Sequence, residues 1–192
     1  LSEDKVKWEA VNQVTKAGST VELPKMMIAD AWLGQIKDMK TTVPVVDQVQ
    51  RLVGCTSTIF QIMNQAGDML RIATNVAKED GTRAIGTYIP AVNADGKPNP
   101  VVASVLKGET YTGRAVVVNA WYLTAYEPLK DKSGKIIGML YVGEKLEAAA
   151  SLRRTIKNIR VGKTGYVAIV GGHGEHHGHY VISKDGARDG QS

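Results

Sequence analysis

Three side chains that carry a hydroxyl group stand at alternate positions of one short segment. Trp121–Tyr126 is rich in aromatic and apolar residues and is expected to form a strand. The period of two then places Tyr122, Thr124 and Tyr126 on one face, opposite an apolar face. Such a row is either the water-exposed side of a half-buried strand or the wall of a ligand pocket. The segment itself leaves both interpretations open.

The histidines of the chain gather in a single glycine-rich segment, 173–179. They are His173, His176, His177 and His179. Imidazole nitrogens, together with the carboxylate of Glu175, are ligands that zinc and nickel accept. However, four glycines occur between Gly171 and His179, which favours a hairpin loop, and the HExxH spacing is absent. We therefore expect no metal and no other cofactor, and a His-rich metal-binding domain is the alternative.

The sequence shows no arrangement of side chains that is typical of an enzyme. Cys55 has no histidine near it and stands at the head of an apolar strand, where a buried, unreactive thiol is the usual state. The GxSxG nucleophile motif, the phosphate-binding glycine–lysine loop and a paired-carboxylate motif are missing. We therefore expect a protein that is not an enzyme.

Composition and charge narrow the function further. The chain has 192 residues, of which 43% are hydrophobic, so it can bury a core. Its net charge of +5 comes from singly scattered lysines and arginines, which argues against nucleic-acid binding. A single cysteine leaves the cellular compartment open. No apolar run approaches the roughly 20 residues that span a bilayer. Because the chain starts at Leu1 and stops soon after a strand-like segment, we expect a fragment whose membrane anchors lie elsewhere.

The expected elements make an α+β fold. Strands are predicted at Thr56–Met63, Met69–Lys78, Ala115–Val118, Trp121–Tyr126 and Ile136–Val142, with a tight corner at Asn119-Ala120. Helices are predicted at Val45–Val53, Pro100–Leu106 and Leu146–Ile159. This order is typical of a PAS-like fold, a five-stranded antiparallel sheet with helices and loops that cover one face and enclose a cavity.

The predicted domains follow from these elements. Residues 1–43 are expected to form a short helix or an extended arm that packs on the main domain, and residues 44–145 the PAS-like domain. Residues 146–160 are the connector helix, and residues 161–192 the opening hairpin of a second module, with strands in Gly165–Val170 and Tyr180–Ser183. The last strand runs into the connector helix without a proline or a flexible linker.

Several stretches together resemble a known family. They are WEAVNQVTKAGSTVELPKMMI at Trp8–Ile28, CTSTIFQIMNQAGDMLRIATNV at Cys55–Val76, GTRAIGTYIP at Gly81–Pro90 and EPLKDKSGKIIGMLYVG at Glu127–Gly143. They resemble the extracytoplasmic double Cache sensor domain of bacterial methyl-accepting chemotaxis receptors. Related domains also occur on sensor histidine kinases. GKTGYVAIV and GHYVISKDG look like the start of the membrane-proximal Cache module, most of whose expected strands are missing.

The resemblance implies that a small organic acid or amino acid binds between the sheet and its covering loops. A buried carboxylate needs charge-assisted donors, of which a guanidinium is the best, and neutral hydroxyl or amide donors beside it. We place the pocket on Arg71, Thr74, Asn75, Arg83, Thr87, Tyr88, Arg114, Trp121, Tyr122, Thr124 and Tyr126.

The same resemblance predicts the biological setting. We expect the periplasmic sensor domain of an inner-membrane chemotaxis receptor, which binds a small carboxylate such as acetate and passes the signal through the helix after the last strand. The full-length receptor is expected to be a homodimer, and to meet the membrane only through segments outside this chain. The alternatives are the sensor domain of a histidine kinase, the His-rich metal-binding domain, and a purely structural dimerisation module.

Overall fold

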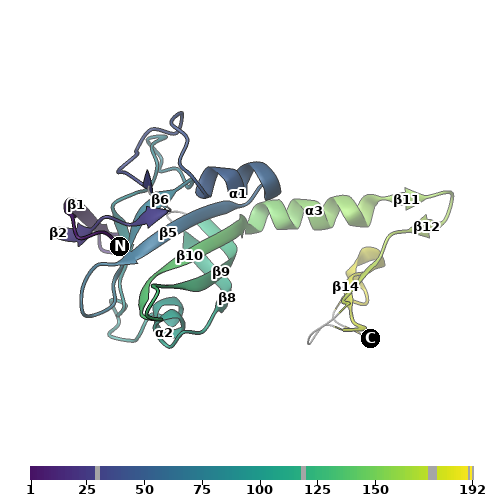
Figure 1. The fold of residues 1–192 in the computed structure, drawn as a ribbon. Coiled ribbons are helices and arrows are strands. Elements are labelled where there is room, and N and C mark those ends of the chain that lie inside the picture. The colour runs from purple at the N-terminus through teal and green to yellow at the C-terminus, as the bar shows by residue number, and fades with distance from the viewer. Residues whose placement is uncertain (29–30, 118–119, 173–176, 190, 192) are drawn as a thin grey trace. The chain divides into compact units, whose positions relative to one another are not determined.

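Alternating buried and exposed residues build one large sheet in the first part of the chain. The computed structural model describes residues 1–28, 31–117, 120–172, 177–189 and 191, in two units, Leu1–Glu144 and Lys145–Ser192 (Figure 1). Eight strands form the sheet of the first unit. In sheet order they are β2 (Gly18–Pro24), β1 (Lys5–Asn12), β7 (Thr87–Ile89), β6 (Met69–Thr74), β5 (Thr56–Ile62), β10 (Ile136–Lys145), β9 (Ala120–Lys130) and β8 (Tyr111–Val117).

The five strands expected from the sequence are contiguous neighbours in this sheet, as β6, β5, β10, β9 and β8. The expected five-stranded, purely antiparallel sheet is nevertheless wrong, because β7 and the β1–β2 hairpin extend it beyond β6 and β1 runs parallel to β7. The N-terminal segment forms a strand rather than a helix, since Trp8, Ala10 and Asn12 are buried at every second position. Strands β1 and β2 are thus part of the sheet and not an arm on its surface.

Two apolar cores lie on opposite faces of the sheet, and one helix covers each. Helix α1 (Val46–Val53) belongs to one core and α2 (Pro100–Leu106) to the other (Figure 1). Neighbouring residues of one strand, such as Ile59 and Phe60, belong to different cores, as the pleat of a strand requires. The face under α2 carries most of the buried tyrosines and holds the candidate site.

Both helices of the first unit were predicted from their end signals. Pro100 opens α2, and the side chain of Asn99 accepts hydrogen bonds from the first backbone amides of that helix. Gly54 ends α1 in the left-handed conformation with φ 76°, which glycine adopts without strain. After β2, the chain forms a short two-stranded pair, β3 (Met27–Ile28) with β4 (Ala31–Trp32). The predicted corner at Asn119-Ala120 includes Asn119, which lies outside the described residues.

The second unit begins where the last sheet strand ends. Strand β10 ends at Lys145 and helix α3 (Leu146–Asn158) begins at the next residue. The following strands are β11 (Arg160–Val161), β12 (Gly165–Tyr166), β13 (Ile169–Val170) and β14 (Tyr180–Ile182), and a 3₁₀ turn, η2, follows at Lys184–Gly186. Strands β13 and β14 pair antiparallel on either side of the histidine-rich segment. The single strand predicted at Gly165–Val170 is wrong, because the structure divides it into β12, which pairs with β11, and β13.

One carboxylate holds the end of the second unit to its helix. Asp189 accepts hydrogen bonds from the amide and hydroxyl of Ser183, and it forms ion pairs with Arg153 and Lys157 of α3 at 2.9 and 3.3 Å. These hydrogen bonds lower the pKa of Asp189 far below its ordinary value, so it is ionised at neutral pH. Within the described part of the chain, each helix is too short or too polar to cross a membrane.

Candidate functional site

An arginine lies buried on the face of the sheet that holds the α2 core, and none of the described carboxylates pairs with it. Arg71 of β6 is 1% exposed, and its Nη1 donates a hydrogen bond to the hydroxyl of Thr87. Its guanidinium carbon lies 4.9 Å from the centre of the Phe60 ring, and its Nε has no hydrogen-bond partner among the described residues. Arg71 forms no ion pair with any residue that the structure describes. The guanidinium of Arg71 is therefore a buried cation that also has an unused hydrogen-bond donor, its Nε.

This arrangement is energetically costly without a bound anion. Burial lowers the pKa of Arg71 to about 10, although the phenol groups of Tyr126 and Tyr141 act in the opposite direction. The guanidinium therefore remains charged at neutral pH. A charge in a protein interior is normally paired, because its lost hydration is otherwise not replaced. Perturbed groups of this kind concentrate at functional sites.

Two buried tyrosines stand next to Arg71. Tyr126 of β9 and Tyr141 of β10 are each 1% exposed, and their ring centres are 5.0 Å apart. Burial raises the pKa of Tyr126 to about 12, even though Arg71 opposes the change. Burial likewise raises the pKa of Tyr141 far above its usual value. Both phenols thus stay protonated at neutral pH and can donate hydrogen bonds to an anion.

Sequence reasoning included Tyr126 but missed Tyr141 and Phe60. A signal for both existed in the alternation of β10 and β5. The register pairs Met139 with Phe60, and Tyr141 lies two residues further along on the same face. The identity of the neighbouring strand cannot be read from one sequence, so the three aromatic rings could not be brought together before the fold was known.

A pocket of about 310 Å³ opens beside Tyr126. Its wall includes Arg114 and Trp121, two further residues predicted from sequence, together with Tyr111 and the start of α2 at Pro100. This volume is at the lower end of the range for small-molecule sites. None of the described residues that line the pocket is an aspartate or a glutamate. Its polar side chains are therefore a cation, phenols and amides, and Arg71 is not among the lining residues. The cation suits an anionic ligand, and the neutral oxygens, among them the buried and unpaired Oε1 of Gln13, are the acceptors that the described lining offers to an ammonium group.

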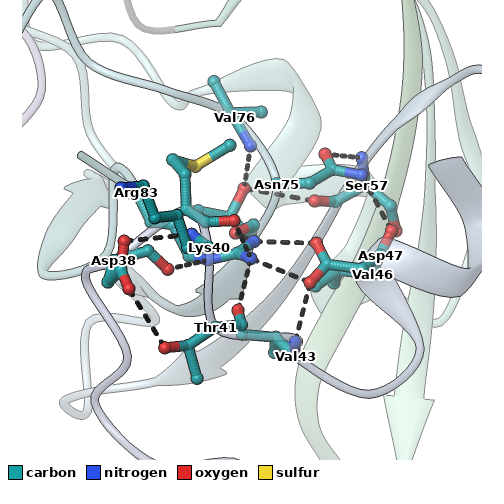
Figure 2. Close-up of polar contacts among 12 residues, drawn as sticks. Asp38, Lys40, Thr41, Val43, Val46, Asp47, Ser57, Asn75, Val76 and Arg83 are labelled. Carbon is teal, nitrogen blue, oxygen red and sulfur yellow. Dashed lines mark hydrogen bonds and ion pairs between the residues drawn. The ribbon is translucent and has the colours of Figure 1, made fainter. Parts of the chain in front are cut away.

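The second buried arginine is already fully engaged. Arg83 forms a two-pronged ion pair with Asp47, and both Nη–Oδ distances are 2.8 Å. Its other hydrogen bonds go to the backbone carbonyls of Asp38, Met39, Thr41 and Thr74. Figure 2 shows this guanidinium enclosed by the carboxylate and the 38–41 loop. Because its donors are occupied, we assign Arg83 to the fold and not to a ligand.

Arg83 also contributes to a lowered pKa of Asp47. Burial alone would raise the pKa of Asp47, but the hydrogen bonds from Arg83 and the Val43 amide and the nearby positive charges outweigh it, so the pKa is lowered. Asp47 is therefore an ionised, structural partner at neutral pH.

Thr74 and Asn75 also have structural contacts rather than free polar groups. The Thr74 hydroxyl lies 2.6 Å from that of Thr58, and it accepts a hydrogen bond from the Val76 amide. The Asn75 amide group bridges the backbone of Ser57 and Val46 at 2.7 and 2.8 Å (Figure 2). These bonds tie β5, β6 and α1 together.

The other predicted residues divide between the two faces of the sheet. Tyr122, Thr124 and Tyr126 are all buried on one face of β9, as expected from the period of two, so this row does not face solvent. The Thr124 hydroxyl donates to the Gly113 carbonyl at 3.0 Å. Tyr88 lies on the core of the other face and its hydroxyl accepts from Asn12. Trp121 is 57% exposed and Arg114 is exposed, so both belong to the mouth of the pocket at most.

The histidine segment is only partly described. His173 and His176 lie outside the described residues. Among the residues that the structure does describe, including His177 and His179, no three histidine, cysteine or acidic side chains are close enough to hold a metal ion.

Comparison with known proteins gives one family. The family model of the Cache 3/Cache 2 fusion domain matches residues 1–192, which is the whole chain. A comparison with curated protein sequences gives no significant match.

Proposed function

Because the chain belongs to the Cache 3/Cache 2 fusion family, we propose that it is the ligand-binding sensor domain of a bacterial receptor and that Arg71 binds an anionic ligand. Cache domains are extracellular sensor domains that bind small molecules and are generally not enzymes. The observation that supports the proposal is the buried guanidinium of Arg71, which has an unused donor and no described counter-ion.

The proposed ligand is a small monocarboxylate such as acetate or propionate. A carboxylate would accept charge-assisted hydrogen bonds from Arg71 and neutral ones from Tyr126, while the rings of Phe60 and Tyr126 would exclude water. An amino acid needs, in addition, an acceptor for its ammonium group. Since no carboxylate lines the described pocket, that group would find only neutral acceptors there, such as the amide oxygen of Gln13, and its charge would have no counter-ion.

The proposed setting is the periplasmic side of an inner-membrane chemotaxis receptor that works as a homodimer. A histidine kinase with the same type of sensor domain is the alternative, since the site of this chain suits both. In either receptor the proposed exit for the signal is the direct continuation of β10 into α3, with Leu146 following Lys145.

The proposal is tested by calorimetric titration and thermal unfolding of the chain with sodium propionate and with alanine, which carries an extra ammonium group. At 100 times Kd, propionate should stabilise the protein by about 2.7 kcal/mol. Alanine should bind at least tenfold more weakly. Arg71→Met should abolish the propionate effect, whereas Arg154→Met, a control at an exposed position of α3, should keep it.

Two results would contradict the proposal. One is the absence of stabilisation across a panel of short carboxylates while amino acids or amines stabilise the chain. The other is an unchanged affinity of Arg71→Met for propionate.

A further inference from the structure

Three residues at the end of β10 and the start of β5 form a chain of hydrogen bonds that the proposed ligand site does not yet include. The hydroxyl of Thr56 lies 3.0 Å from the hydroxyl of Tyr141 and 2.7 Å from the carbonyl oxygen of Gly143. Thr56 and Gly143 face each other in the β5–β10 ladder. These hydrogen bonds thus connect the aromatic cluster around Arg71 to the backbone two residues before the end of β10.

The direction of these hydrogen bonds follows from counting hydrogens. A carbonyl oxygen only accepts, so the single hydroxyl hydrogen of Thr56 points to Gly143. The contact between Thr56 and Tyr141 must then use the phenol hydrogen of Tyr141. Tyr141 donates to Thr56, and Thr56 donates to Gly143.

These hydrogen bonds depend on the glycine at position 143. A Cβ atom built on Gly143 would lie 2.2 Å from the hydroxyl oxygen of Tyr141, far inside the contact distance of two such atoms. The missing side chain therefore leaves the space in which the Tyr141 hydroxyl meets Thr56.

Ring contacts connect Tyr141 to Arg71: the Arg71 guanidinium carbon lies 4.9 Å from the centre of the Phe60 ring, the Phe60 and Tyr126 centres are 6.4 Å apart, and those of Tyr126 and Tyr141 are 5.0 Å apart. Tyr126 and Tyr141 are the two phenols that oppose the burial effect on the pKa of Arg71, and both rings lie in the core that α2 covers. An anion held by Arg71 would attract the phenol hydrogen of Tyr141. That hydrogen can serve the anion or Thr56, but not both with good geometry.

Resting on the proposed function, we propose that Tyr141 is a ligand-binding donor and that Thr56 and Gly143 are its positioning residues. When an anion takes the hydrogen of Tyr141, the phenol oxygen becomes an acceptor, and the single hydrogen of Thr56 is shared between it and the Gly143 carbonyl. Ligand binding thereby weakens the hydrogen bond to Gly143, and the end of β10 changes just before α3 begins at Leu146. The ligand can shift this junction only by its different affinity for the two arrangements.

The test uses Thr56→Val, which keeps the shape and removes the hydroxyl, Thr56→Ser, which keeps the hydroxyl, and Tyr141→Phe. Propionate is the probe, and the readouts are its Kd and amide hydrogen exchange at residues 143–146. Thr58→Val is the matched control, since it deletes another buried threonine hydroxyl of β5, one that is bonded to Thr74 and not to Tyr141.

In the wild-type chain, propionate should change exchange at residues 143–146 several-fold. Thr56→Val should keep Kd within about fivefold and lose this change, while Thr56→Ser and Thr58→Val should keep it. Tyr141→Phe should raise Kd by about 10- to 100-fold, because a hydrogen bond to a charged group is lost. A wild-type exchange response in Thr56→Val, or an unchanged Kd in Tyr141→Phe, would overturn the inference and leave the proposed function intact.

A measurement without ligand separates the two proposals. In the ligand-free chain, Thr56→Val should exchange faster than Thr56→Ser at residues 143–146, because the Gly143 carbonyl has lost its hydroxyl donor. Equal rates would overturn the Thr56 link whether or not propionate binds. Failure of the wild-type chain to bind any short carboxylate would instead refute the proposed anion site.

Discussion

Replacing Arg83 by methionine should lower stability and preserve ligand binding, whereas replacing Arg71 by methionine should preserve stability and abolish ligand binding. Both guanidinium groups are 1% exposed, and methionine keeps a long side chain of similar reach in each place. They differ in their partners, because Arg83 has the Asp47 carboxylate and Arg71 has no described counter-ion.

The magnitudes follow from those partners. Breaking a buried ion pair by removing one member costs about 3–5 kcal/mol. For Arg83→Met this corresponds to a fall in Tm of roughly 6–20 °C for a chain of this size. For Arg71, the burial that lowers its pKa to about 10 corresponds to an energetic penalty of about 3 kcal/mol. Its bond to Thr87 and its contact with Phe60 offset about 2–4 kcal/mol of this. Arg71→Met should therefore change stability by no more than about 2 kcal/mol.

Urea unfolding of both variants, with and without propionate, measures both effects. Arg83→Met should be strongly destabilised, and the fraction that remains folded should still bind propionate. Arg71→Met should unfold near the wild-type midpoint and gain nothing from propionate. If Arg71→Met lost as much stability as Arg83→Met, the guanidinium of Arg71 would be structural, and the reasoning that reserves it for a ligand would be refuted.

Three further predictions concern Asp47, two tyrosines of β9 and the junction between β10 and α3. The pKa of Asp47 is lowered in the folded state, so its stabilising contribution is complete above the ordinary carboxyl value of 3.8 and is lost as the pH falls through the lower folded-state pKa. The difference in unfolding free energy between wild type and Asp47→Asn should therefore shrink in acid. A difference that stays constant down to pH 2 would contradict this. Tyr126→Phe should weaken propionate binding by about 10- to 100-fold with little loss of stability. Tyr122→Phe should weaken it less, because the charged group that acts on the Tyr122 hydroxyl is Glu144 and not Arg71. Equal affinities of both variants and the wild type in a titration would move the pocket away from β9. In the full-length receptor, inserting Gly-Gly-Ser after Gly143 should leave ligand affinity nearly intact and uncouple the response, and a receptor that still responds would show that the signal leaves by another route.

The central part of the fold could be predicted because its signals are local. The turn residues, the proline that opens α2 and the alternation in β9 each act over a few residues, and the structure shows the corresponding elements. The eight-stranded sheet could not be predicted, because β7 has only three residues and the β1–β7 pairing joins residues far apart in the chain. Pairings at such separation leave no mark on either strand alone.

The candidate site was predictable in type but not in membership. Sequence indicated that an arginine and several hydroxyl groups would surround a carboxylate, and it gave no means of ranking Arg71 against Arg83. That ranking depends on whether a carboxylate from elsewhere in the chain reaches the guanidinium, as Asp47 does for Arg83. Tyr141 and Thr56 were missed for the same reason, since their contact links positions 85 residues apart.

The central claim is that an anion binds at Arg71, and a crystal structure of the chain with bromoacetate tests it most directly, because the anomalous signal of bromine locates the ligand. The account predicts bromine under α2, with a carboxylate oxygen about 2.7–2.9 Å from the guanidinium of Arg71 and within hydrogen-bonding distance of the Tyr126 hydroxyl. Bromoacetate bound elsewhere in the first unit, with Nε of Arg71 still unpaired, would contradict it.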